Sequence, residues 1–229
     1  MSGSSFWVVF LILVAVAGGI ALGTYYARRR RQDAFALFAR QYALEFSIED
    51  PFGLVSLPFT LFQRGDGRGV ENVLYGGWQG MSVHAFDYWY YDESTDSNGN
   101  SSKTYRRFCC AVTPIEAACS PLSIDEENLL TRLADMVALD DIGFESEEFN
   151  RAFNVQGRDR AFATAFVDAR MMSWLLSHGR GYAFEVVGDQ VLVACDRVPP
   201  LQLLQLLGTA KAFVEQVPTV VFSLYPKSG

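Results

Sequence analysis

The sequence predicts an α+β fold, in which one N-terminal transmembrane helix precedes an antiparallel-sheet domain with inserted helices. Residues 6–27 are apolar and uncharged, and four consecutive arginines follow them. Three segments between residues 72 and 114 are rich in β-branched and aromatic residues and are separated by turn-forming or polar residues. Segments with apolar residues at helical spacing come later in the chain. A pleckstrin-homology-like half-barrel, in which a late helix closes several strands, is the alternative fold.

Composition and charge limit the classes of protein to which this chain can belong. Of its 229 residues, 50% are hydrophobic and 14% aromatic, so it can bury a substantial core and is not intrinsically disordered. The formal net charge is −7. Four of the 19 basic residues are Arg28, Arg29, Arg30 and Arg31, and no acidic residue precedes them, so residues 32–229 hold 15 basic and 26 acidic residues, a net charge of −11. Such an acidic domain is not expected to bind nucleic acid.

The apolar segment 6–27 is expected to be a membrane-spanning helix. A helix of this length extends ~33 Å, and the hydrocarbon core of a bilayer is ~30 Å thick. Trp7 at one end and Tyr25 and Tyr26 at the other have side chains that prefer the membrane interface. Because cytoplasmic loops are enriched in basic residues, the arginine run places the N-terminus outside and the domain in the cytoplasm. The chain thus divides into an anchor, residues 1–31, and a cytoplasmic domain, residues 32–229, with any further boundary near residues 115–123.

Two features of the anchor predict contacts with other molecules. The four arginines form a basic collar that is expected to contact anionic lipid head groups, so that residues 6–31 bind membrane lipid. Ala15, Gly19 and Gly23 are spaced four apart, and small residues on one face allow two helices to approach closely. These three residues predict a homodimer through this face of the helix.

A secretory signal peptide is the alternative interpretation of the same segment. Ala15-Val16-Ala17 resembles a cleavage site, which would make Ala17 the cleavage point. Residues 1–5 contain no Lys or Arg, however, and four arginines follow the apolar stretch at once, which favours an anchor. An exported protein is therefore the alternative to a cytoplasmic domain.

The first half of the domain is predicted to be mainly sheet. Residues 32–44 are expected to form a helix that continues from the anchor or is hinged to it, and residues 59–62 a short strand among turns. Ser123 and Glu126 fit a capping box at the start of a helix over residues 123–138. Strands are expected at residues 72–78, 81–91 and 104–114, with a turn at Gln79-Gly80 and a solvated hairpin loop over residues 92–103.

The last third of the chain is predicted to alternate short strands with helices. Residues 199–217 have the apolar stripe of an amphipathic helix, and residues 219–224 are expected to form a strand. The other elements expected here are a strand at residues 149–155, a helix at residues 159–177 with a break near Asp168, and a hairpin of residues 182–187 and 190–195 over Gly188-Asp189.

No pattern in the sequence indicates a catalytic, cofactor-binding or metal-binding residue. The two histidines lie far apart, and no GxSxG motif is present. The glycine-rich run at residues 64–69 lacks the Lys-Ser/Thr of a phosphate-binding loop and is expected to be a turn. Cys109, Cys110, Cys119 and Cys195 have no CxxC spacing, so free thiols are expected, with no zinc site and no cofactor.

The most unusual segment is the aromatic run from residue 86 to residue 91. Strand alternation places Phe86, Tyr88 and Tyr90 on one face, which is expected to be core. Trp89 and Tyr91 fall on the other face, beside charged residues. This second face is either another buried layer or an exposed surface for a partner protein of unknown identity.

The order of these segments resembles a family of bacterial single-pass membrane proteins of unknown function. The resemblance rests on the anchor, the arginine run, the aromatic-rich helix, and residues 72–76 (NVLYG) and 85–88 (AFDY). Residues 149–155 (FNRAFNV) and 171–176 (MMSWLL) extend it over about residues 30–200. It implies a bacterial membrane-anchored α+β domain, and it implies no established activity and no catalytic residues.

These observations favour a non-enzymatic interaction or regulatory domain tethered to the cytoplasmic face of the membrane. The alternative from another class is a membrane-anchored enzyme whose site is built from dispersed carboxylates and arginines. A deep pocket that holds an Asp or Glu with a strongly shifted pKa would favour the enzyme. A flat aromatic patch at Trp89 and Tyr91 would favour binding.

Overall fold

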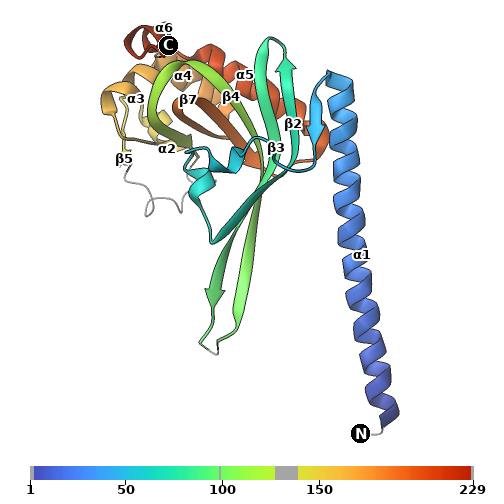
Figure 1. The fold of residues 1–229 in the computed structure, drawn as a ribbon. Coiled ribbons are helices and arrows are strands. Elements are labelled where there is room, and N and C mark those ends of the chain that lie inside the picture. The colour runs from blue at the N-terminus through green and yellow to red at the C-terminus, as the bar shows by residue number, and fades with distance from the viewer. Residues whose placement is uncertain (1–2, 98, 127–138, 228–229) are drawn as a thin grey trace.

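The computed structural model describes residues 3–97, 99–126 and 139–227 and has an α+β arrangement (Figure 1). A long N-terminal helix, α1 (Gly3–Tyr42), stands beside a domain built on one antiparallel sheet. The N-terminus lies at the end of α1 that projects away from the domain, and helices from the C-terminal half cover part of the sheet. The predicted fold class is confirmed.

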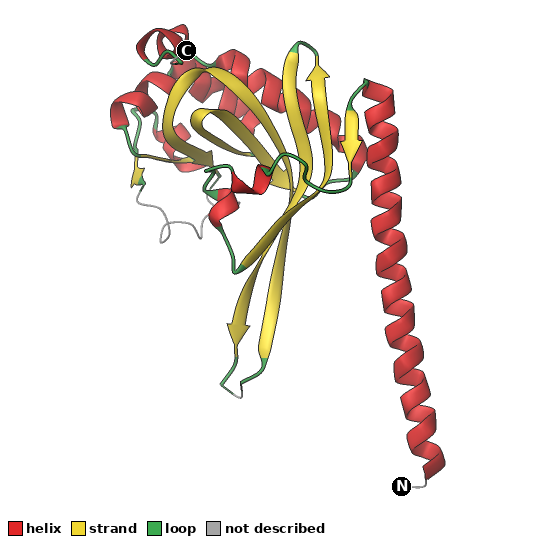
Figure 2. Ribbon diagram, viewed as in Figure 1, coloured by secondary structure: helices red, strands yellow, loops and turns green. Residues whose placement is uncertain are grey.

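The sheet has the strand order β1-β2-β3-β4-β6-β5, and β7 also pairs with β4. Every pairing is antiparallel. The longest strand is β4, which curls together with β7 (Figure 2), because their register is interrupted between Pro114 and Leu122. The strands are β1 (Glu45–Ser47), β2 (Gly67–Trp78), β3 (Met81–Thr95), β4 (Ser101–Asp125), β5 (Asp140–Asp141), β6 (Asn154–Gly157) and β7 (Ala183–Asp196).

Three of the short helices begin at a side chain that caps them. Ser146, Asp159 and Asp168 accept hydrogen bonds from backbone N–H groups in the first turns of α2, α3 and α4. Asp168 thereby produces the predicted break in the helical segment 159–177. The helices are α2 (Glu147–Ala152), α3 (Arg160–Phe166), α4 (Ala169–Trp174), α5 (Leu203–Gln216) and α6 (Thr219–Leu224), with 3-10 turns η1 (Leu54–Ser56), η2 (Leu61–Gln63) and η4 (Pro200–Gln202) and a π-helical turn, η3 (Leu175–Gly179).

Two apolar cores lie on opposite faces of the sheet. The larger core joins the C-terminal helices and the end of α1 to the sheet, and within it the rings of Phe184 and Phe213 stack with centroids 4.5 Å apart. The smaller core lies under η1 and η2 and contains Phe86. Neighbouring residues of one strand enter different cores, as Cys109 and Cys110 do, because side chains alternate along a strand. All four cysteines are buried free thiols, as predicted.

The β3–β4 hairpin is longer than the sequence predicts. The two strands remain paired to Thr95 and from Ser101, through most of the segment expected to be a loop. The hydroxyl groups of Ser94 and Ser102 face each other across the strands at 3.0 Å. Because the backbone ladder and these hydroxyl pairs hold polar residues together, the lack of apolar side chains does not end the strands.

Three short segments differ from their predicted conformations. Residues 149–155 begin within α2, because Phe149 and Phe153, four residues apart, both enter the larger core. Residues 219–224 form α6, whose Val221 is buried, so packing overrides the strand propensity of Thr-Val-Val. Residues 59–62 lead into the turn η2 and do not form a strand.

The hairpin predicted at Gly188-Asp189 is a bend within a single strand. β7 pairs with β4 on both sides of the bend, with Val186 opposite Leu122 and Val191 opposite Thr113. Gly188 has φ 59°, a conformation that glycine adopts readily, and it allows β7 to follow the curl of β4. The Gly-Asp pair therefore serves curvature and not chain reversal.

The helix predicted over residues 123–138 lies mostly outside the described residues, which omit residues 127–138. Ser123 belongs to β4 and pairs with both β6 and β7, so it does not begin a helix. Residues 115–123, near which the sequence allows a domain boundary, also lie within β4.

Candidate functional site

The helix α1 has two environments along its length. From residue 10 to residue 30 its residues are exposed, whereas Phe35, Phe38 and Ala39 are buried in the larger core. The exposed part is long and apolar enough to span a membrane. Because α1 continues from one part into the other without a break, a membrane-spanning segment would be joined rigidly to the domain.

A buried ion pair fixes α1 to the sheet at the junction of these two parts. Asp87 of β3 has a side chain that is only 3% exposed, and Arg31 of α1 grips its carboxylate with two hydrogen bonds of 2.6 Å, from Nε and Nη2. Arg31 Nη1 also donates to the carbonyl oxygen of Val198 at 2.8 Å. Paired, bidentate contacts of this kind are the strongest that an arginine makes with a carboxylate.

Two further residues complete the surroundings of Asp87. Asn72 Nδ2 donates to Asp87 Oδ2 at 2.9 Å, and Arg197 Nη2 lies 3.5 Å from the same oxygen. Asn72 sits in a bulge of β2 with φ 58°, where the register with β3 shifts. Asn tolerates this conformation better than most residues, and the bulge directs its side chain to Asp87. Sequence reasoning missed this cluster, and its one local sign was a lone acid between Phe86 and Tyr88 in an aromatic strand.

The four arginines of the collar do not share one environment. Arg28, Arg29 and Arg30 are exposed, and Arg29 lies 3.7 Å from Asp33 on the same helix. Arg31 differs because its side chain, 13% exposed, is bound to Asp87. Contact of the three exposed arginines with lipid head groups stays a prediction, and the fourth serves the junction between helix and sheet.

An open cleft of about 1000 Å³ lies between α1 and the domain just beside this junction. Arginines from both sides line it, Arg28, Arg30 and Arg31 from α1 and Arg107 and Arg197 from the domain. Its remaining lining residues are Ala21, Thr24, Tyr25, Ala27, Ala34, Glu71, Val198, Pro199 and Pro200.

The aromatic run divides as predicted between the two faces of β3. Phe86, Tyr88 and Tyr90 are buried in the smaller core. Trp89 and Tyr91 are half-buried on the other face, and their rings stack with centroids 6.4 Å apart. The Trp89/Tyr91 face is thus a partly exposed layer outside both cores.

Glycines of β2 make room for this aromatic layer. Gly69 and Gly67 lie directly opposite Trp89 and Tyr91 in the sheet. A Cβ at Gly69 would stand 2.7 Å from Cζ2 of Trp89, and one at Gly67 would stand 2.5 Å from Cε1 of Tyr91. The glycine-rich run 64–69, predicted to be a turn, therefore enters strand β2 at Gly67. The aromatic rings pack against the backbone of these glycines, which have no side chains to displace them.

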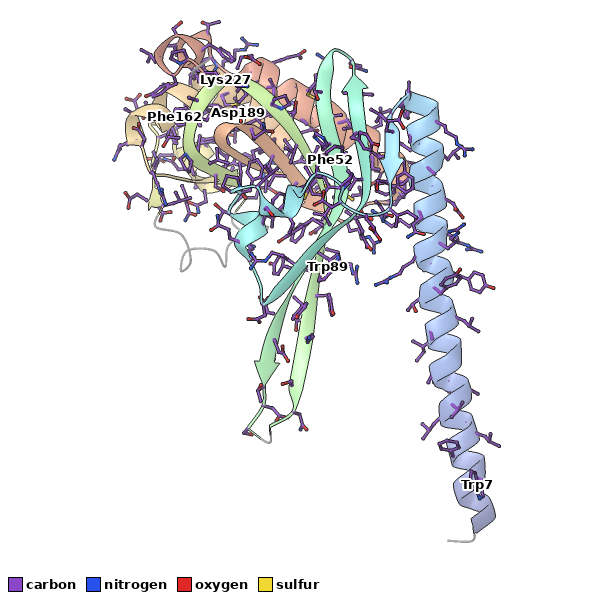
Figure 3. The ribbon with its side chains drawn as sticks, in the orientation of Figure 1. Trp7, Phe52, Trp89, Phe162, Asp189 and Lys227 are labelled. Atoms are coloured by element: carbon purple, nitrogen blue, oxygen red, sulfur yellow. The ribbon has the colours of Figure 1, made fainter. Side chains whose placement is uncertain are left out.

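Charged and aromatic groups of β4 extend the same layer. The ring of Tyr105 lies 5.9 Å from that of Trp89 and 5.3 Å from that of Tyr91. Lys103 Nζ lies 4.2 Å from the centre of the Tyr91 ring. We call Trp89, Tyr91 and Tyr105 the aromatic patch. Figure 3 shows Trp89 at the base of the projecting hairpin, which extends to the same side of the domain as the N-terminal part of α1.

The predicted helix-dimer face lies in the exposed part of α1. Ala15, Gly19 and Gly23 are all exposed, and a Cβ built at Gly19 or Gly23 would meet nothing within 4 Å. A second helix can therefore approach this face without displacing any described part of the chain. Dimerisation through it stays a prediction.

Two buried carboxylates bear on the alternative of an enzyme. Burial raises the pKa of Asp125 to about 7, partly offset by the charge of Arg64. Burial also raises the pKa of Glu185, whose carboxylate accepts hydrogen bonds from the backbone N–H groups of Thr60 and Leu61. Neither carboxylate lines the cleft beside α1. Through these hydrogen bonds Glu185 fixes the backbone at the start of η2, so its role is structural.

Comparison with known proteins yields a structural neighbour and no family. No family model and no curated protein matches the sequence. A solved structure, the mycobacterial trehalose monomycolate transport factor A, TtfA, is similar to 87% of this chain and 97% of its own chain, with a TM-score of 0.59 and 14% sequence identity. At this identity the likeness concerns the fold, and it agrees with a helix followed by an antiparallel sheet and packed helices.

Proposed function

We propose that this protein is a membrane-tethered adaptor, without an active site of its own, whose β3–β4 hairpin docks onto a membrane protein from the cytoplasmic side. The observation that carries the proposal is the buried ion pair between Arg31 and Asp87. It joins the end of the arginine collar to the base of the hairpin. Once α1 is inserted in a bilayer, the position of the hairpin relative to that bilayer is set by this contact.

The hairpin is long enough to reach the membrane. Thr95 lies eight positions beyond Asp87 along β3, which corresponds to ~26 Å of strand, the length of about 17 residues of an α-helix. The hairpin projects to the side of the domain from which the N-terminal part of α1 extends (Figure 1). Its tip therefore lies at the membrane surface or beside the span.

The hairpin cannot be covered by lipid alone. Asp92, Glu93 and Asp96 are exposed near its tip, and carboxylates are excluded from hydrocarbon. The aromatic patch on one face of the same hairpin offers large rings that gain stability when they are covered. A polar surface of an integral membrane protein satisfies both requirements, because it can accept the acidic tip and cover the rings.

The structural neighbour supports this class of partner. It bears the name of a trehalose monomycolate transport factor. The present chain shares that fold over most of its length. We therefore infer that the partner belongs to a membrane transport apparatus.

The orientation of the domain can be tested by labelling introduced cysteines. The four native cysteines are buried, so they give little background in the folded protein. Ser101→Cys in the hairpin is expected to react with a membrane-impermeant maleimide only after the cells are lysed. Ser4→Cys, on the other side of the span, is expected to react in intact cells. Labelling of Ser101→Cys in intact cells would show that the domain is outside and would support the exported alternative.

The partner surface can be tested by photocrosslinking in native membranes. A photoreactive amino acid at position 105, within the aromatic patch, is expected to give one discrete adduct with an integral membrane protein. The same amino acid at Arg106, exposed on the opposite face of β4, is the matched control and is expected to give no such adduct.

The Trp89→Ala variant connects the adduct to the aromatic patch. It is expected to reduce the adduct at position 105 severalfold while the free energy of unfolding falls by only about 1–2 kcal/mol, because Trp89 is half-buried. Denaturant unfolding in detergent measures that cost. Unfolding of the domain would show that Trp89 belongs to the core, and an undiminished adduct would exclude the patch as the docking surface.

A further inference from the structure

We propose that the cleft between α1 and the sheet binds the phosphate head group of an anionic phospholipid. This inference rests on the part of the proposed function in which α1 spans the membrane, and it does not depend on the partner protein. It differs from a general attraction of the arginine collar to the membrane, because it assigns part of the site to residues of the folded domain.

The charge of the cleft is opposite to that of the domain that forms it. Five arginines line the cleft, and two carboxylates oppose them, Glu71 in its wall and Asp87 behind Arg31. A net charge of +3 therefore remains in the cleft, whereas residues 32–229 as a whole carry −11. A local excess of positive charge on an acidic domain attracts an anion to that place in particular.

The arginines of the domain retain donors that can reach a ligand. Arg107 faces Glu71 only at 3.8 Å, and its side chain is 36% exposed. Arg197 approaches Asp87 only at 3.5 Å, through Nη2, and its side chain is 29% exposed. Neither side chain is held by a close ion pair, so both can donate hydrogen bonds to a phosphate oxygen in the cleft. Arginine suits this task because its planar fork of donors matches phosphate geometry.

The position of the cleft distinguishes a lipid from a soluble anion. One wall consists of Ala21, Thr24 and Tyr25, which belong to the exposed apolar part of α1. The ring of Tyr25 has the amphipathic character of residues at the membrane interface. Pro199 and Pro200 close the opposite side with surfaces that carry no N–H donor. A phospholipid fits this combination of a charged part and an apolar part, with its phosphate among the arginines and its acyl chains along the apolar wall.

The test compares two double variants with the same change in charge. Arg30→Gln with Arg107→Gln removes one cleft arginine from α1 and one from β4. Arg29→Gln with Arg106→Gln removes the neighbouring arginine in each element, neither of which lines the cleft. The full chain is reconstituted in nanodiscs of equal parts phosphatidylglycerol and phosphatidylcholine, and native mass spectrometry measures the lipid that remains bound on release.

The wild-type chain is expected to retain phosphatidylglycerol in preference to phosphatidylcholine. The cleft variant is expected to bind phosphatidylglycerol at least about tenfold more weakly than the wild type does. The control variant is expected to retain this lipid as the wild type does. Equal losses in the two variants would indicate a nonspecific effect of surface charge and would overturn the proposal. Retention by the cleft variant would overturn it as well.

Two further measurements separate the alternatives. Inorganic phosphate at millimolar concentration is expected not to displace the bound lipid, and displacement would show that the site prefers a soluble anion. Resistance of the wild-type chain to extraction from membranes by alkaline carbonate reports the membrane anchor independently. An extractable chain would contradict the proposed function and the lipid site together, whereas a resistant chain without lipid preference would contradict the lipid site alone.

Discussion

Asp87→Ala is expected to lower the free energy of unfolding by about 3–5 kcal/mol, one of the two largest effects that we predict for a single substitution. The carboxylate is buried and receives hydrogen bonds from Arg31 and Asn72, with Arg197 close by. Its removal leaves the charge of Arg31 buried without its partner. Loss of one member of a buried pair costs far more than the pair contributes, because the remaining charge stays desolvated.

The matched control for Asp87→Ala lies on the same strand. Glu93→Ala also removes a carboxylate from β3, but its partner Lys103 is 3.9 Å away and both side chains are about 40% exposed. Exposed pairs of this kind contribute about 0–1 kcal/mol, so the control is expected to change stability little. Denaturant titration of the full chain in detergent micelles gives both values. If the two variants lost the same stability, the contact between Arg31 and Asp87 would not hold α1 to the sheet.

Asp125→Asn is expected to raise the free energy of unfolding at pH 8 by about 2–4 kcal/mol. Burial raises the pKa of Asp125 to about 7, well above about 3.9, the ordinary value in an unfolded chain. At pH 8 the folded protein therefore holds a desolvated carboxylate that the unfolded chain would expose to water. An uncharged amide of the same shape removes that cost.

The pH dependence gives the same prediction a second readout. A raised pKa means that the folded state binds the proton more tightly than the unfolded state does. The contribution of Asp125 to stability is therefore full below pH 4, declines as the pH rises to about 7, and is lost above that value. Glu185 has its pKa raised for the same reason, so part of this decline is expected to remain in the Asp125→Asn variant.

The control for Asp125→Asn is Asp92→Asn, which neutralises an exposed carboxylate on β3. Unfolding free energies of the wild type and the two variants are to be compared between pH 5 and pH 8. The difference between wild type and Asp125→Asn is expected to grow with pH, whereas Asp92→Asn follows the wild type throughout. Parallel curves for all three proteins would mean that Asp125 titrates as an exposed acid does.

Local patterns in the sequence were sufficient for most of the scaffold. The apolar length of residues 6–27 predicted a helix able to span a membrane, and the alternation from Phe86 to Tyr91 predicted which rings enter the core. These patterns succeed because hydropathy and strand periodicity act between neighbours in the chain. Where local propensity and tertiary packing favour different conformations, packing decided the conformation. In α6 the burial of Val221 outweighs the strand propensity of its segment.

The candidate site could not be derived in the same way, because its contacts join distant parts of the chain. Arg31 meets Asp87 across 56 residues, and Arg197 approaches the same carboxylate across 110. Which acid pairs with which arginine depends on strand register, on the bulge at Asn72 and on the packing of α1 against the sheet.

The sequence by itself thus determined that this protein has a membrane-length helix, a basic collar and an aromatic strand face. Only the tertiary structure decided that one collar arginine locks the helix to the sheet and that Arg107 and Arg197 complete a cleft beside it. The physical reason is that hydropathy and periodicity are properties of neighbouring residues. A charged pair is stable only where the folded chain brings both groups out of water together.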